Sequence, residues 1–89
     1  MVLLYGKQPT WLNVFYYNEA QRFKAMEARL LKRARRLGGD ANYYRNGPGE
    51  NEYLGSCMEN GSIRAYRAAE RAYACYRRAM EKAYEGLGP

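Results

Sequence analysis

The chain has 89 residues and a formal net charge of +6 at pH 7, which allows one domain with a modest core. It holds no run of about 18 apolar residues, so the sequence predicts no membrane span. The opening MVLLYGKQPTW lacks the basic region and the long apolar core of a cleaved signal peptide. These features predict a protein that is intracellular or packaged within a virus particle.

The composition argues against catalytic and metal chemistry. With no histidine, the chain cannot assemble a Ser-His-Asp or a Cys-His arrangement. For a metal site the sequence offers neither histidine nor a CxxC spacing, and it contains no phosphate-binding glycine motif. Cys57 and Cys75 do not make a disulfide framework and are predicted to be free thiols. We therefore expect no enzyme activity, no cofactor and no metal.

The first long helix is predicted over residues 10–37, after an extended N-terminal arm at residues 1–9. Pro9 keeps the arm from continuing as a helix, and Thr10 supplies an N-cap. Apolar residues then recur every three or four positions, which is the helical repeat and not the strand repeat. The residues that share this face are Leu12, Tyr16, Ala20, Phe23, Met26, Leu30, Ala34 and Leu37. Trp11 is expected to be a packing anchor.

The connection between the two long helices is rich in glycine and asparagine. Gly38 and Gly39 are predicted to stop the first helix, because glycine takes the left-handed conformation without steric cost. A loop at residues 38–48 follows, and apolar residues at helical spacing then predict a short helix at residues 49–59. An Asn-Gly dipeptide after it indicates a tight turn into the last helix.

The second long helix is predicted over residues 62–87, with Ser62 as its N-cap and Gly86 at its end. Its apolar face consists of Tyr66, Ala69, Tyr73, Tyr76, Met80, Ala83, Tyr84 and Leu87. Beside that face lies a flank of alanines, small enough for another backbone to approach closely: Ala65, Ala68, Ala72 and Ala79. The tyrosines are expected to be core residues rather than a stacking platform.

These elements predict an all-α fold, an antiparallel hairpin of two long amphipathic helices. A short third helix lies in the connection, an extended arm precedes the hairpin, and residues 1–89 form a single helical domain. Because a hairpin of two helices leaves much of each apolar face in water, we expect the protein to self-associate.

Arginine outnumbers lysine 11 to 4. It lines up opposite the apolar face of the second long helix, and at the edge of the apolar face and beyond it on the first. Its guanidinium group contacts phosphate or carboxylate through two N–H groups at once, whereas lysine acts as a point charge. The candidate nucleic-acid contacts are Arg22, Arg29, Arg33, Arg36, Arg64, Arg67, Arg71 and Arg78. Tyr43 and Tyr44, in the predicted loop beside Arg45, are candidates for stacking on bases. A plain solvated face stays open as the alternative for the arginines.

The pattern favours a self-associating basic helical protein that binds the nucleic-acid backbone without reading its sequence, in a coat or architectural role. In general style it is similar to the helical nucleoprotein coat subunits of viruses, without a motif that identifies a family. The alternative is a small regulator or inhibitor from a mobile element that docks on an acidic partner protein. A membrane-surface role is disfavoured, since the apolar faces are rich in tyrosine and alanine and poor in leucine, isoleucine and phenylalanine.

Overall fold

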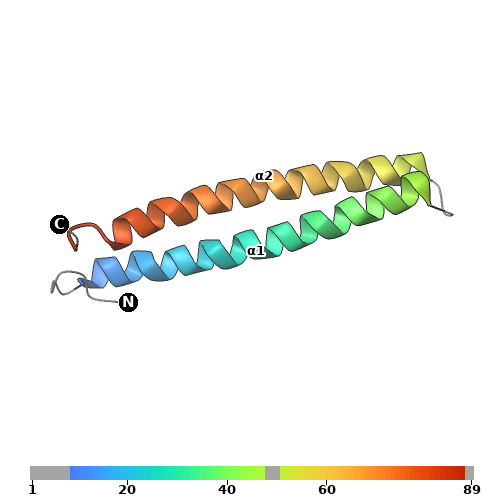
Figure 1. Cartoon of the computed structure of the whole chain (residues 1–89). Helices are drawn as coiled ribbons and strands as arrows, with labels where there is room; N and C mark the ends of the chain where they lie inside the picture. Colours follow the sequence, from blue (N-terminus) through green and yellow to red (C-terminus); the bar gives the residue numbers. More distant parts are fainter. Residues whose placement is uncertain (1–8, 48–50, 88–89) are drawn as a thin grey trace.

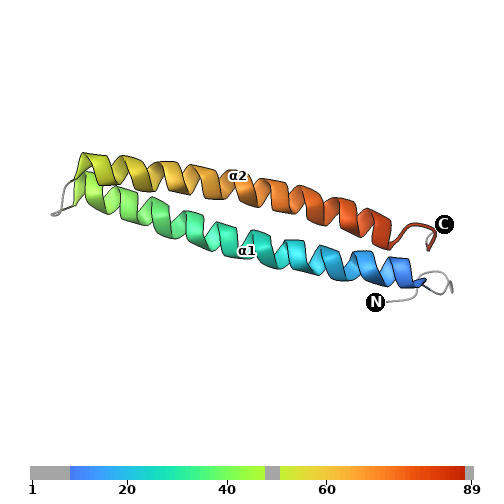
Figure 2. The same ribbon diagram turned by 180° about the vertical axis from the view of Figure 1, so that it is seen from behind.

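A computed structural model describes residues 9–47 and 51–87 of the chain. In these residues the regular structure consists of two antiparallel helices, α1 (Trp11–Asn46) and α2 (Glu52–Ala83). The helices lie side by side along their whole length, as both views of the ribbon show (Figures 1 and 2), and the molecule measures 62 × 19 × 15 Å. The predicted all-helical hairpin of two long helices is confirmed.

The beginning of α1 is held by a capping box. Thr10 is the N-cap, as predicted: its hydroxyl accepts a hydrogen bond from the Asn13 backbone N–H at 3.3 Å, and its own N–H donates to Asn13 Oδ1 at 2.8 Å. The Asn13 amide also donates to the carbonyl oxygens of Ala83 at 2.9 Å and Glu85 at 3.2 Å. One buried side chain therefore caps α1 and ties it to the end of α2.

The seam between the helices is filled by small residues. Asn13 apart, its buried members on α1 are Ala20, Ala34 and Ala41, and those on α2 are Gly55, Ser62, Ala65, Ala69, Ala72, Ala79 and Ala83. Within each helix many of these residues are spaced by seven or multiples of seven, the repeat that keeps one stripe facing a partner helix. No large side chain of the described residues is fully buried. The core is thus narrow and allows a close approach of the two backbones.

Two hydrogen bonds define the register of the seam. The Ser62 hydroxyl donates to the Ala34 carbonyl oxygen at 2.8 Å, while Asn13 reaches Ala83 as described above. Ala34 lies 21 residues after Asn13, and Ser62 lies 21 residues before Ala83, so both contacts belong to one antiparallel alignment. The prediction that Ser62 is an N-cap is wrong, because this residue lies in the middle of α2 and uses its hydroxyl across the seam.

Glycines that were predicted to end helices lie inside them. α1 continues through Gly38 and Gly39 to Asn46, so the predicted helix end at residue 37 and the loop at 38–48 are wrong. A Cβ at Gly38 would lie 3.4 Å from Ser62 Oγ, in contact across the seam. Glycine costs a helix about 1 kcal/mol relative to alanine, a cost that packing between helices can offset. Gly39 has no such neighbour, and nothing in the structure explains it.

The predicted short helix at residues 49–59 is not a separate element, since α2 runs without a break from Glu52 to Ala83. The predicted Asn-Gly turn is likewise helical, and a Cβ at Gly61 would lie 3.2 Å from Leu37 Cδ1. The Asn51 side chain caps α2 by accepting from the Leu54 N–H at 3.0 Å. Pro9 apart, the predicted arm lies outside the described residues.

The larger predicted core residues are less buried than expected. Tyr66 and Tyr73 are each 42% exposed, whereas three members of the alanine flank beside them are buried. Trp11, predicted to be a packing anchor, is 78% exposed. The predicted apolar face of α2 is therefore centred too far toward the tyrosines, whereas Ala20 and Ala34 of the predicted α1 face are buried as expected. Close contact between two backbones favours the small residues instead.

Candidate nucleic-acid interface

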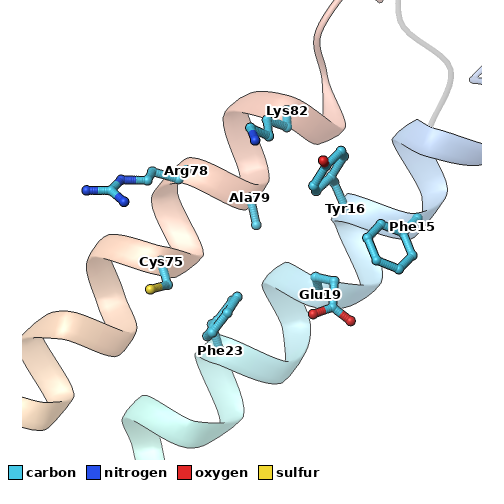
Figure 3. Close-up of a pocket in the computed structure, with 8 residues that line it drawn as sticks. All are labelled: Phe15, Tyr16, Glu19, Phe23, Cys75, Arg78, Ala79 and Lys82. Atoms are coloured by element: carbon cyan, nitrogen blue, oxygen red, sulfur yellow. The ribbon is translucent and has the colours of Figure 1, made fainter.

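The hairpin presents two broad faces, one on each side of the seam. We define the phenylalanine face by Phe15, Phe23 and Leu30 of α1 and Gly61, Ala68 and Cys75 of α2, which line two hollows between the helices. In the hollow nearer the chain ends, Phe23 points toward Cys75 and Ala79 across the groove (Figure 3). Its walls differ in charge, because Glu19 stands on α1 whereas Arg78 and Lys82 stand on α2.

The opposite side is the tyrosine face, formed by Lys24 and Arg45 of α1 and Glu59, Tyr66 and Tyr73 of α2. Lys24 Nζ lies 5.4 Å from the Tyr73 ring centre and 5.2 Å from that of Tyr76, which is cation–π distance. Arg45 forms an ion pair with Glu59 between the helices. This face is therefore covered in part by charged side chains of the same molecule.

Lys24 also donates to Glu27 at 3.0 Å. That hydrogen bond raises the pKa of Lys24 above its ordinary value, against an opposing contribution from desolvation. The sequence contained no signal for Lys24, because its cation–π contacts are with tyrosines of the other helix.

Six of the predicted arginines form two regular rows. On α1, Arg22 and Arg36 follow the seam alanines Ala20 and Ala34 by two residues, about 200° around the helix. On α2 each member of the row directly precedes a seam alanine, about 100° away, and borders the phenylalanine face, where Arg64 and Arg78 line the hollows. The row on α1 is Arg22, Arg29 and Arg36, and the row on α2 is Arg64, Arg71 and Arg78. Successive members are seven residues apart, or about 10.5 Å along the axis. Each helix thus carries one row.

Few of the predicted arginines are neutralised within the molecule. Among the described residues, Arg22 is the only one of the eight that forms an ion pair, with Glu19 at 3.1 Å. Its side chain is 80% exposed, so this pair contributes little. The guanidinium groups of the other seven are exposed and available to an external anion.

Arg33 joins the cations of the two helices. With Arg29, Lys32 and Arg36 it lines a hollow on α1, and with Arg64 of α2 it lines the middle hollow of the phenylalanine face. No carboxylate lines either hollow. We call these five residues the central basic patch. The sequence contained a signal for Lys32, which lies in the KRARR cluster at 32–36, although it was not among the predicted contacts.

The other candidates lie outside this patch. Arg67 and Arg71 are exposed on α2, and Arg78 lines the hollow nearer the chain ends. Tyr43 and Tyr44 belong to the last turns of α1 and not to a loop. Their ring centres lie 5.3 Å apart in an edge-to-face arrangement, and Tyr43 is 53% exposed. The structure therefore leaves one ring of the pair accessible for stacking.

Metal and membrane chemistry receive no support from the described residues. They contain no group of three or more side chains that could hold a metal ion, and neither α1 nor α2 is long and apolar enough to cross a bilayer. Cys57 and Cys75 are free thiols. Comparisons with protein-family models, with curated proteins and with solved structures returned no match. Any functional argument therefore rests on the geometry of the chain.

Proposed function

We propose that the protein is a self-associating helical protein that binds the backbone of nucleic acid without reading its sequence, in a coat or architectural role. The observation that carries this proposal is the central basic patch, in which Arg33 joins cations of both helices in hollows that no carboxylate lines. Exposed guanidinium and ammonium groups bind phosphate by releasing its counterions, whatever the base sequence.

The placement of the two arginine rows supports an architectural role. The rows run along both helices and meet only in the central basic patch, where Arg64 of α2 lies beside Arg33 of α1. A helical protein with cations along both helices is suited to contact phosphates along its length.

The test is a titration of a fluorescent duplex DNA and a duplex RNA across a salt series, followed by anisotropy. We expect the affinity to fall steeply with salt and to be similar for unrelated base sequences. Arg33→Gln should weaken binding uniformly and reduce the salt slope by about 1. Arg77→Gln is the matched control, because Arg77 is an exposed arginine outside the patch and outside both rows, so its effect should be smaller.

An affinity that stays constant between low and moderate salt would overturn the electrostatic proposal. The alternative, docking on an acidic partner protein, predicts that a partner stays bound to the protein after nuclease treatment. In that case Arg33→Gln should release the partner protein, and both the wild-type protein and this variant should bind duplexes weakly.

A further inference from the structure

The hairpin exposes more surface than a compact chain of its size. Its accessible surface is 6673 Å², whereas a compact monomer of this mass exposes about 5,400 Å². Its radius of gyration is 19.1 Å, against about 12 Å for a compact domain of this length. The surplus of about 1,300 Å² exceeds the roughly 800 Å² that each partner buries in a standard interface. One docked copy would account for much of this surplus.

The two faces differ in how far the molecule covers them itself. On the tyrosine face, Lys24 lies over Tyr73 and Tyr76, and the ion pair of Arg45 with Glu59 spans the helices. On the phenylalanine face the described residues form one such contact, in which Lys82 Nζ lies 5.1 Å from the Tyr16 ring centre, and no ion pair spans the helices. Phe15, Phe23 and Ala79 line the apolar part of the terminal hollow. A partner that docks on the tyrosine face must displace or desolvate the charges of that face, which costs free energy.

We propose that a second copy of this chain docks on the terminal half of the phenylalanine face. Phe15 is 48% exposed beside a floor that contains Phe23, Cys75 and Ala79. The aromatic rings of one copy can therefore enter the space above the small residues of the other, so that the large side chains become buried.

The charges of this hollow are self-complementary. Glu19, which also pairs with the exposed Arg22, stands on the α1 wall. Arg78 and Lys82 stand on the α2 wall, with Lys82 over the Tyr16 ring. In a twofold-symmetric dimer each contact occurs twice, so the acidic wall of each copy can face the basic wall of the other. The same arrangement places charged residues at the rim and apolar residues at the centre, as in protein interfaces generally.

This inference deepens the self-association in the proposed function and rests on it. It places one candidate nucleic-acid contact, Arg78, inside the interface and the central basic patch outside it. Arg33 and the rest of the central basic patch lie farther toward the middle of the hairpin, beyond the hollow that contains Phe15 and Cys75. Docking over the terminal half leaves that patch open to an anion.

The two cysteines provide the test. Cys75 lies in the proposed interface, whereas Cys57 is exposed and lines neither hollow of that face, so it serves as an internal control. The nuclease-treated full-length protein is alkylated with iodoacetamide at 0.5 M salt over a concentration series, with mass measured by light scattering. We expect dimer mass to develop with concentration, and the alkylation rate of Cys75 to fall at least about tenfold while that of Cys57 is constant.

A matched pair of variants separates the two faces. Phe15→Glu places a charge in the hollow and should raise the dimer dissociation constant by about tenfold or more. Ile63→Glu changes a residue of similar exposure, 42%, that lines the hollow on the tyrosine face, and should leave the constant unchanged. Circular dichroism of both variants establishes that the helices remain formed.

The outcomes are distinct. If the wild-type protein dimerises but Phe15→Glu behaves like Ile63→Glu and Cys75 is unprotected, the assigned surface is wrong and self-association stands. If the wild-type protein stays monomeric at all concentrations, both the docking and the self-association are wrong. Neither result bears on the salt-dependent binding of duplexes, which the anisotropy titration measures separately.

Discussion

The seam and the two outer faces of the hairpin use different residues for different tasks. In the seam, alanine, glycine and serine are buried, and two polar side chains, those of Asn13 and Ser62, bond to carbonyl oxygens of the other helix. On the faces, large side chains such as Phe15, Tyr66 and Tyr73 are only partly covered. Small residues thus determine how closely and in what register the helices lie, while the large side chains keep a substantial exposed area for contacts outside the hairpin.

This contrast has an energetic consequence. The stabilisation from burial grows with the apolar area removed from water, by about 25 cal/mol per Å², and an alanine contributes little area. A seam built mainly of alanines therefore provides limited stability on its own, and each seam contact is a large share of the total. Substitutions in the seam should be much more damaging than similar substitutions on the faces.

The largest effect is expected from enlarging the seam. Ala69→Leu adds three carbon atoms at a position that is 2% exposed, and should destabilise the hairpin by about 2–3 kcal/mol because the helices must separate. Ala74→Leu, at an exposed position of the same helix, is the control and should change stability by less than about 0.5 kcal/mol. Urea denaturation followed by circular dichroism measures both. Equal losses would contradict the assignment of the seam.

A smaller effect is expected at the end of the seam. Asn13→Ala removes half of the capping box and both hydrogen bonds to the end of α2, which should cost about 1–2 kcal/mol. Asn18→Ala changes an exposed asparagine of the same helix and should be neutral or slightly stabilising, since alanine is the better helix former. If the two variants unfold at the same urea concentration, Asn13 does not connect the helices as described.

Two helical glycines, Gly39 and Gly55, should respond to alanine substitution with Tm changes in opposite directions, because of the two only Gly55 lies close to the other helix. Gly39→Ala meets no atom within 4 Å and should stabilise the protein by about 0.5–1 kcal/mol, with a rise in Tm of several degrees. At Gly55 the new Cβ would lie 2.7 Å from Arg45 Cγ, so Gly55→Ala should lower Tm despite its better helix propensity. Differential scanning calorimetry resolves both shifts. A rise in both variants would show that Gly55 is not at a close approach.

The smallest effect concerns the tyrosine face and depends on pH. The hydrogen bond to Glu27 raises the pKa of Lys24 in the folded state, so its stabilising contribution is present below about pH 10.5 and is lost as pH rises through the raised value. Lys24→Met should therefore lower Tm slightly at pH 7, and its Tm should converge with that of the wild-type protein as pH rises through the raised pKa of Lys24. Lys32→Met, which removes an exposed lysine of the central basic patch, should not reduce Tm at pH 7. A Tm difference between Lys24→Met and the wild-type protein that does not change with pH would show that the charge of Lys24 does not stabilise this face.

Local patterns in the sequence were sufficient for the existence of two long helices and for one cap, but not for the end of α1 or the start of α2. The three-to-four-residue spacing of apolar residues predicted both helices, and Thr10 after Pro9 predicted the start of α1. The sequence also showed an alanine flank suited to close approach. Its role as the seam could not be decided from one helix, because the choice between Ala72 and Tyr73 as the buried residue depends on how near the partner backbone lies.

What could not be predicted depends on the other helix. Gly38 and Ser62 carry the local signature of a helix end, but each packs against the facing helix in mid-helix. The candidate nucleic-acid interface was likewise only partly predictable from the sequence. The seven-residue spacing of arginines was visible in the sequence, whereas the meeting of Arg33 with Arg64 in one hollow follows from the register that the Ser62 hydrogen bond defines.

The bond from Asn13 to Ala83 also determines where attachments to the chain would sit. Thr10 and Leu87, near the two ends of the described chain, lie together at one tip of a rod 62 Å long, and the end of α1 at Asn46 and the start of α2 at Glu52 lie at the other tip (Figure 1). Fluorophores attached near Thr10 and near Leu87 should therefore transfer energy efficiently within one molecule. A single fluorophore attached near Gly47 would instead show, through energy transfer between molecules, whether two hairpins meet at their tips or overlap by half their length.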